Sequence, residues 1–327
     1  MTNLKKQIID FQYDNKTIGQ MFKTVEVTTK ENKVYLELGY DDTVIIDIPA
    51  LKKALMKYLK LDLNYEGAKI TFKDLMKEKL EQQSILHQEN ILFLLVASGK
   101  GGVGKSNVAA NLAVAFKNLG HRVALIDCDI YGSSIPNIFE VDKYPRLSEG
   151  MLYAYNKDGI DIVSVDFLTR STLPVIWRGP MLQQVLNHFF YYTVYQDNLD
   201  IVLIDMPPGT GDVALDVFNA LPKAKQIIVT TPHQDAAMIA IKAGVMALKM
   251  NFDVIGVVEN MSYYNYEGKK LAIFGSGGGD LVANTLNVPL LAQLPIETPR
   301  QGSLYQKDEA AYANYQALAK KIKNYVK

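Results

Sequence analysis

The 327-residue sequence has one cysteine, one tryptophan, four histidines and no excess of charge of either sign. The single cysteine, Cys128, excludes an intrachain disulfide and any metal site that needs two cysteines of one chain. The 35 Lys and Arg residues balance the 35 Asp and Glu residues, so bulk charge does not indicate a nucleic-acid partner. The longest apolar run, residues 91–97, is far shorter than the roughly 20 residues that span a bilayer. Because the first residues also lack the apolar stretch of a signal peptide, we expect a cytoplasmic protein without stable membrane association.

The chain is longer than one average domain, and its two parts differ in pattern. Apolar and polar residues alternate over residues 25–38 and 43–48, which predicts two short strands. A helix is predicted at 50–61 and a third strand at 68–72. We therefore expect a small α+β domain over residues 1–80, a polar linker over 81–90 and a larger domain over 91–327.

In the larger part, continuous apolar segments alternate with helical ones. Strands are predicted at residues 91–97, 122–127, 160–166, 201–205, 226–231, 254–259 and 290–294. Helices are predicted at residues 105–119, 180–195, 235–250, 279–286 and 308–326. This alternation predicts an α/β fold, a mostly parallel sheet with helices on both faces. Ligands of such sheets bind at the carboxyl ends of the strands.

The segment after the first of these strands fits the pattern G-x-x-x-x-G-K-[ST]. It consists of Gly99, Lys100, Gly101, Gly102, Val103, Gly104, Lys105 and Ser106, with Asn107 next. Glycines let backbone N–H groups turn inward around phosphate oxygens, and the helix that follows adds the positive end of its dipole. A strand before the pattern and a helix after it are the context that supports a phosphate-binding loop. We expect these residues to bind ATP, with Lys105 reaching the β- and γ-phosphates and the Ser106 hydroxyl ligating Mg²⁺.

Carboxylates follow two further strands. Asp127 ends one strand and Asp129 comes two residues later, where an acidic side chain can orient an attacking water or hold a metal-bound water. Asp127 is expected either to bind water of the metal shell or to cap the turn. Asp205 follows four apolar residues, and we expect it to hold Mg²⁺ through water.

Two other features concern the nucleotide, and a second glycine cluster does not. The loop after Asp205 contains Gly209 and Gly211, either of which could offer its N–H to the γ-phosphate. The amide of Asn260 could pair with the adenine edge, and backbone groups near Pro295 could bracket the ring. The glycine cluster at residues 275–279 lacks a following Lys-Ser pair and is predicted to be a turn that enters a helix.

Lys100 distinguishes this loop from an ordinary phosphate loop, which does not require a lysine at that position. The sequence Gly-Lys-Gly-Gly-Val-Gly-Lys-Ser resembles the deviant loop of proteins such as MinD, ParA and the nitrogenase iron protein. Together with the segments at 127–136, 174–180, 205–212, 257–263 and 274–279, it makes the chain resemble the Mrp/ApbC family of ATPases. This resemblance implies a homodimer with weak, dimer-dependent ATP hydrolysis. It also implies that Lys100 acts on the partner's nucleotide, that Asp129 is the catalytic switch carboxylate, and that Lys105 is catalytic.

The family resemblance implies that the protein assembles iron–sulfur clusters or carries them to apoproteins. The implied partners are these apoprotein clients or iron–sulfur assembly proteins. The family usually has Cys-x-x-Cys a few residues beyond Asn-Met-Ser, whereas this chain has Tyr263-Tyr264-Asn265-Tyr266 there. Iron–sulfur clusters usually need four thiolates, and Cys128 is interpreted as a packing residue. Two hypotheses stay open: a cluster carrier that uses other ligands or a partner's cysteines, and a MinD/ParA-like nucleotide-dependent regulatory or positioning switch.

Overall fold

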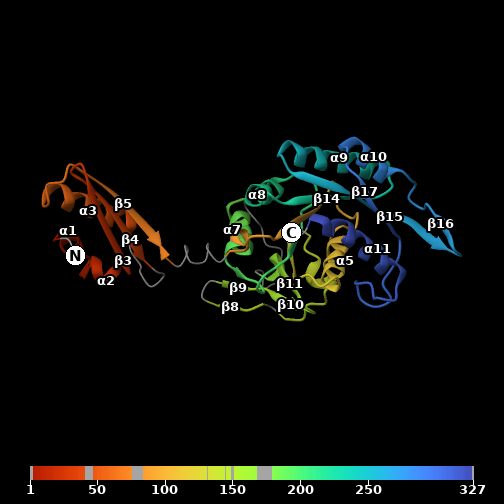
Figure 1. Ribbon diagram of the computed structural model, residues 1–327, viewed down its shortest axis with the longest axis horizontal. Helices are drawn as coiled ribbons and strands as arrows, with labels where there is room; N and C mark the ends of the chain where they lie inside the picture. The colour runs from red at the N-terminus through yellow and green to blue at the C-terminus, as the bar shows by residue number, and fades with distance from the viewer. Residues whose placement is uncertain are drawn as a thin grey trace. The chain divides into compact units, whose positions relative to one another are not determined.

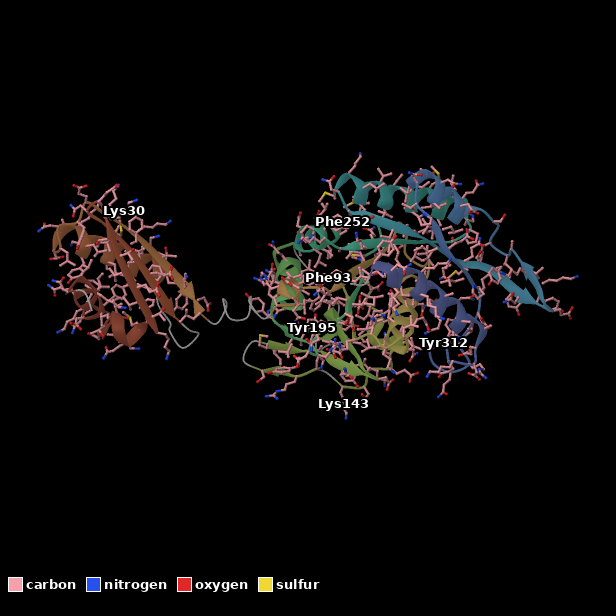
Figure 2. The ribbon with its side chains drawn as sticks, in the orientation of Figure 1. Lys30, Phe93, Lys143, Tyr195, Phe252 and Tyr312 are labelled. Atoms are coloured by element: carbon pink, nitrogen blue, oxygen red, sulfur yellow. The ribbon has the colours of Figure 1, made fainter. Side chains whose placement is uncertain are left out.

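The computed structural model describes residues 3–40, 47–75, 84–130, 132–143, 145–148, 151–167 and 179–325, with backbone alone at 179–182. Tyr131 and residues 174–178 of the motif predicted at 174–180 thus lie outside the described residues. The chain forms two compact units that divide between residues 83 and 84 (Figure 1). Within each unit, side chains fill the space between the sheet and its helices (Figure 2).

The N-terminal unit is a three-stranded sheet with helices packed on one face. It contains α1 (Asn3–Ile9), β1 (Gln12–Tyr13), β2 (Lys16–Thr17), α2 (Ile18–Met21), β3 (Thr24–Lys30), β4 (Lys33–Tyr40), α3 (Ile48–Leu61) and β5 (Gly67–Asp74). β3 and β4 are antiparallel, and α3 provides the crossover to β5, which is parallel to β4. Leu51, Leu55 and Leu59 of α3 are fully buried, because their helical spacing places them on one face.

Two predictions for this unit need correction. The alternating stretch at 25–38 is a hairpin of two strands, because Glu31 and Asn32 adopt left-handed backbone conformations and reverse the chain. The strand predicted at 43–48 lies mostly outside the described residues, but its last residue, Ile48, already belongs to α3, whose start is capped by Asp47. The predicted helix at 50–61 and strand at 68–72 are confirmed as α3 and β5.

The second unit is built on a mostly parallel sheet, and all seven predicted strands are confirmed. They are β6 (Leu92–Ser98), β7 (Val123–Asp127), β11 (Ile160–Ser164), β13 (Ile201–Asp205), β14 (Lys225–Thr230), β15 (Asp253–Tyr266) and β17 (Leu290–Pro295). Their order is β11-β7-β13-β6-β14-β15-β17, and all neighbours in it are parallel. Two antiparallel strands extend the sheet: β10 (Tyr155–Lys157) beside β11, and β16 (Lys269–Leu271) beside the outer end of β15.

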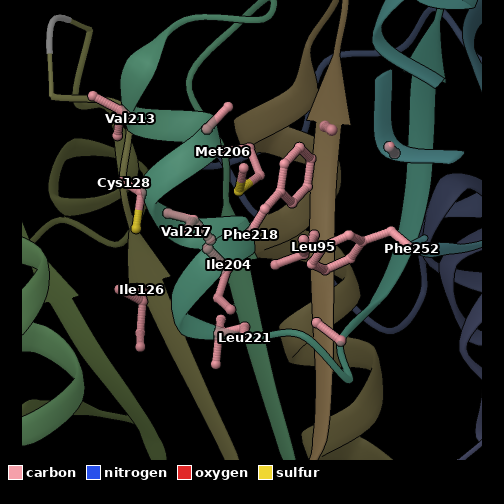
Figure 3. Close-up of a cluster of buried hydrophobic side chains, with 14 of the residues drawn as sticks. Leu95, Ile126, Cys128, Ile204, Met206, Val213, Val217, Phe218, Leu221 and Phe252 are labelled. Atoms are coloured by element: carbon pink, nitrogen blue, oxygen red, sulfur yellow. The ribbon is translucent and has the colours of Figure 1, made fainter. Parts of the chain in front are cut away.

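Helices cover both faces of this sheet (Figure 1). α5 (Lys105–Asn118) and α11 (Ala310–Ile322) pack on one face, where Leu94 and Val96 of β6 point. The opposite face carries α7 (Gly179–Tyr191), α8 (Asp212–Ala220), α9 (Gln234–Lys249) and α10 (Gly278–Leu286). Leu95 points to that face and lies in a cluster with residues of α8 and with Phe252 (Figure 3). The α/β prediction is therefore confirmed.

Several boundaries differ from the predictions. The helix predicted at 180–195 ends at Tyr191, because Thr193 and Val194 form β12 and pair with β9 (Met151–Tyr153). β9 also pairs with β8 (Leu147–Ser148). The helix predicted to Val326 ends at Ile322 and is followed by a 3₁₀ turn, Lys323–Tyr325. β15 continues well past its predicted end, and α8 and the short α6 (Ile135–Ile138) were not predicted.

Residues 84–90, which the sequence places in the linker, lie in the second unit. A 3₁₀ turn spans Ile85–His87, and Ile85 is buried in the core beneath α7. The Ser84 hydroxyl donates a hydrogen bond of 2.7 Å to the carbonyl of Phe190 in α7. Contacts with α7 therefore hold this segment in the second unit, although its polar composition predicts a linker.

The strand order determines where a ligand can bind. From β6 the chain first builds one side of the sheet: it skips the place of β13, forms β7 and then β11, and returns to form β13 between β7 and β6. It then crosses to the other side of β6 and forms β14. The connections after β6 and β13 thus diverge to opposite faces and leave a crevice at the carboxyl ends of the strands. Within the described ranges, every helix is too short or too polar to cross a membrane.

Phe189 of α7 is fully buried, and Phe274 is 47% exposed. We expect Phe189→Ala to lower the free energy of unfolding of the second unit by about 3–5 kcal/mol, because it leaves a cavity in the core. The matched substitution Phe274→Ala should change it by less than about 0.5 kcal/mol. Urea unfolding followed by tyrosine fluorescence measures both, and equal losses would contradict the assigned packing.

Candidate nucleotide-binding site

The predicted phosphate loop connects the end of β6 to the start of α5. Gly102 and Gly104 have φ values of 82° and 81°, in the left-handed region that glycine adopts without strain. Gly104 is the N-cap of α5. The loop lines a cavity of about 220 Å³ together with the segments that follow β7 and β13. The lining residues are Ser98, Lys100, Gly101, Gly102, Gly104, Lys105, Ser106, Asn107, Asp129, Gly132, Ser134 and Pro208.

Gly99 and Val103, which the sequence assigns to the binding site, support the loop instead of lining the cavity. A Cβ atom at Gly99 would lie 2.3 Å from the carbonyl carbon of Ile239 in α9. Only glycine therefore allows α9 to approach this closely. The side chain of Val103 is 4% exposed and belongs to the hydrophobic core on the α5 face.

Lys105, Ser106 and Asp205 meet at the back of the cavity. The Lys105 ammonium lies 2.6 Å from Oδ1 of Asp205, and the Ser106 hydroxyl donates a hydrogen bond of 2.5 Å to Oδ2. Asp205 is fully buried at the end of β13, and burial raises its pKa while Lys105 opposes that shift. Buried charges are tolerated only when paired and hydrogen-bonded, so these three groups depend on one another.

The two carboxylates after β7 have different surroundings. Asp129 lines the cavity, and its Oδ2 is 3.8 Å from the Lys105 ammonium. Asp127 is fully buried and accepts hydrogen bonds from the backbone of Asp129 and from the hydroxyls of Ser133 and Ser164. Burial, together with the nearby Asp205, raises the pKa of Asp127 to about 7. Of the two roles expected for Asp127, this geometry is that of a turn cap.

The loop after Asp205 is tied to the phosphate loop. The Gly209 N–H, one of two predicted phosphate donors, instead donates a hydrogen bond of 2.9 Å to the carbonyl of Ser98. Gly211 is the residue just before α8, and Pro208 lines the cavity. Lys100 also lines the cavity, and its side chain is exposed at the mouth.

The residues predicted to recognise the base, Asn260 and Pro295, are absent from the described lining of the cavity. The side-chain amide of Asn260 in β15 donates a hydrogen bond of 2.9 Å to the carbonyl of Val103. Pro295 is buried at the end of β17, where it pairs with Tyr263. The glycine cluster is confirmed as a turn that enters a helix: Gly277 caps α10.

Glu259 is a structural residue that the sequence analysis missed. Its buried carboxylate accepts hydrogen bonds from the Ser262 hydroxyl at 2.6 Å, the Gly279 N–H at 2.5 Å and the Gln293 amide at 3.0 Å. It thus joins β15, β17 and the start of α10. Its only sequence signal is an acidic residue at the end of an apolar strand, the same signal that identifies Asp205.

Cys128 is fully buried in the hydrophobic cluster of Figure 3. Burial, and to a lesser extent Asp127, raises the pKa of its thiol. Its interpretation as a packing residue agrees with this position, because a thiol must lose its proton to ligate a metal. Among the described residues, His, Cys, Asp and Glu side chains form no cluster of three that could hold a metal ion.

Comparison with known proteins reveals relatives over most of the chain. Residues 90–327 match the profile of the ParA family described as NUBPL iron-transfer P-loop NTPase. An iron–sulfur cluster carrier protein of Bacillus subtilis is 38% identical over 317 residues, which are 92% of this chain and 90% of that protein. An iron–sulfur cluster carrier protein of Mycobacterium bovis is 43% identical over 209 residues, 62% of this chain and 55% of that protein.

Solved structures are similar to the second unit. A nucleotide-binding protein of Archaeoglobus fulgidus in complex with ADP is 28% identical, with a TM-score of 0.56 over 74% of this chain and 91% of that one. The cell division ATPase MinD of Pyrococcus furiosus is 22% identical, with a TM-score of 0.53 over 72% of this chain and 99% of that one. At this identity, the likeness to MinD concerns the fold alone.

Two glycines of the loop provide a test of how α9 supports it. A Cβ at Gly99 would collide with the backbone of α9, whereas nothing lies within 4 Å of a Cβ at Gly101. We expect Gly99→Ala to lower the free energy of unfolding by roughly 1–3 kcal/mol, because the helix or the loop must move. Gly101→Ala is the matched control and should leave the thermal midpoint nearly unchanged. Similar midpoints for both variants would contradict the tight contact with α9.

Proposed function

Because the chain belongs to the ParA family of NUBPL-type iron-transfer P-loop NTPases, we propose that it is an ATPase that assembles or transfers iron–sulfur clusters. The resemblance to Mrp/ApbC proteins is confirmed by this family match and by the carrier proteins that are 38–43% identical. The observation that carries the proposal is the relation to the Bacillus subtilis carrier over 92% of this chain, combined with an intact phosphate loop. The likeness to MinD supports the fold and adds no argument for a positioning switch.

The residues at the back of the cavity fit a magnesium ion. The Ser106 hydroxyl and the Asp205 carboxylate are within 2.5 Å of each other, and the carboxylate of Asp129 lines the same cavity. Such hard oxygen donors are those that Mg²⁺ prefers, with phosphate oxygens and water completing the shell. In this proposal Ser106 would hold the ion directly, and Asp205 would hold it through water. Bound Mg²⁺ supplies charge neutralisation on the phosphates.

Three side chains would act in slow ATP hydrolysis. Lys105 neutralises charge on the β- and γ-phosphates once its ammonium turns from Asp205 toward them. Asp129 orients the attacking water for in-line displacement. Lys100, exposed at the mouth of the cavity, acts on the nucleotide of a second copy, as an arginine finger does. Turnover therefore depends on a homodimer.

The two lysines should separate binding from turnover. Lys105→Ala removes the buried cation and should lower Mg-ATP affinity at least tenfold in titration calorimetry. Lys100→Ala should leave affinity within about twofold, because the side chain is exposed, and lower kcat by about 10³-fold or more, the range of an arginine finger. Mixing an excess of Lys105→Ala protein with Lys100→Ala protein should restore part of the turnover, because the former still donates Lys100 in trans. Equal turnover by Lys100→Ala and the parent protein would contradict this role.

The cluster is the cargo, and the chain has few ligands to offer it. A dimer supplies two Cys128 thiols, each fully buried, whereas a cluster usually needs four thiolates. The segment where the family usually has Cys-x-x-Cys forms an exposed hairpin of β15 and β16 with Tyr264 and Tyr266 at its surface. We therefore assign the cluster ligands to a protein partner, either the assembly protein or the client.

Cluster transfer provides the test. A cluster-loaded scaffold protein and an apo-ferredoxin are mixed anaerobically, and visible circular dichroism follows the ferredoxin cluster. The chain with Mg-ATP should accelerate transfer, and Lys105→Ala should not, because it lacks the phosphate-binding cation. Reconstitution of the chain alone with iron and sulfide should yield no stoichiometric cluster, with the same result for Cys128→Ala. An unchanged transfer rate would contradict the carrier function, and a stoichiometric cluster on the isolated chain would contradict ligation by the partner.

A further inference from the structure

Asn260 connects β15 to the phosphate loop across 157 residues of sequence. Its side chain is 8% exposed, and its Nδ2 donates a hydrogen bond of 2.9 Å to the carbonyl of Val103. A Cβ at Gly104 would lie 2.2 Å from the same Nδ2. The amide group therefore fills the space directly behind the peptide that joins Val103 to Gly104.

This contact determines the direction of one backbone N–H. The described peptide bonds are all trans, and in a trans peptide the C=O and N–H groups point in opposite directions. The carbonyl of Val103 points toward Asn260, so the N–H of Gly104 points away from Asn260. Gly104 lines the cavity, whereas Val103 and Asn260 do not. The Gly104 N–H is thus directed toward the side where phosphate oxygens would lie, as an anion-binding loop requires.

Asn260 is itself held in place. Its neighbour Glu259 is anchored by the Ser262 hydroxyl, the Gly279 N–H and the Gln293 amide. Met261, on the other side, has a φ of 54°, an uncommon left-handed conformation for a residue with a long side chain. The register between β15 and β17 also shifts between Glu259 and Tyr263. The strand leaves regular geometry where Asn260 turns to the loop, and such strain persists only where surrounding contacts enforce it.

We infer that Asn260 is a positioning residue of the phosphate loop: its amide orients the Val103–Gly104 peptide so that the Gly104 N–H faces the phosphates. The inference rests on the proposed nucleotide binding, and it differs from the adenine pairing that the sequence suggests. Loss of the amide then weakens binding of any polyphosphate, with or without a base. An adenine-pairing residue would affect only nucleotides that carry the base.

The test compares Mg-ATP with Mg-tripolyphosphate, a probe without base or ribose. For the full-length chain, calorimetry should show that Asn260→Ala weakens both ligands by a similar factor of roughly tenfold, the upper range for one hydrogen bond. Asn260→Leu keeps the branched shape without a donor and should give the same paired loss if the alanine variant is unstable. Asn265→Ala, at an exposed position of the same strand, is the matched control and should bind both ligands like the parent protein.

The outcomes are distinct. A thermal midpoint close to that of the parent protein, combined with equal losses for both ligands, supports the positioning role. Loss of ATP affinity alone overturns it in favour of base recognition, and unchanged affinity for both ligands overturns it outright. If the parent protein binds neither ligand, the proposed ATPase function fails, and this inference fails with it.

Discussion

The arrangement of the second unit depends on the buried pair of Lys105 and Asp205, which joins the first residue of α5 to the last residue of β13. Either charge without a counter-ion would cost several kcal/mol at this depth. The pair requires β6 and β13 to be adjacent and parallel, with Asp205 level with Val96. The same register brings Asp127 of β7 beside Asp205. The order and register of β6, β13 and β7 thus place the charged groups of the cavity around this one ion pair.

The loop that receives the phosphates is shaped mainly by what lies behind it. Gly99 lies against the backbone of α9, Val103 is buried in the core, and Asn260 holds the Val103 carbonyl. The Gly209 N–H links the loop after β13 to Ser98. A site for a highly charged ligand gains from such preorganisation, because its N–H groups need not be ordered at the moment of binding. The nucleotide would therefore affect α9, β15 and the loop after β13 together.

The chemistry of the cargo separates this chain from a carrier that uses its own thiolates. Cys128 packs between apolar side chains and has a raised pKa, which opposes thiolate formation. The outer end of β15, together with β16 and the segment after it, instead presents exposed apolar and aromatic side chains, including Tyr266, Leu271 and Phe274. In the proposed function, nucleotide binding and cluster ligation therefore belong to different proteins, and a complex with the partner is the functional unit.

The sequence alone determined the seven parallel strands, the helices on both faces and the loop from Gly99 to Ser106, because apolar runs and glycine spacing are local signals. It also singled out Asp205, which ends a buried strand, and Asp129, which comes two residues after the end of another. Local pattern did not reveal the end of α7 at Tyr191 or the burial of Ser84, because both depend on distant neighbours. It also missed the local turn at Glu31 and Asn32. The tertiary structure alone decided which groups Gly99, Glu259 and Asn260 contact. Their partners lie up to 157 residues away, and a hydrogen bond or a close approach across that separation leaves no periodic trace in the sequence.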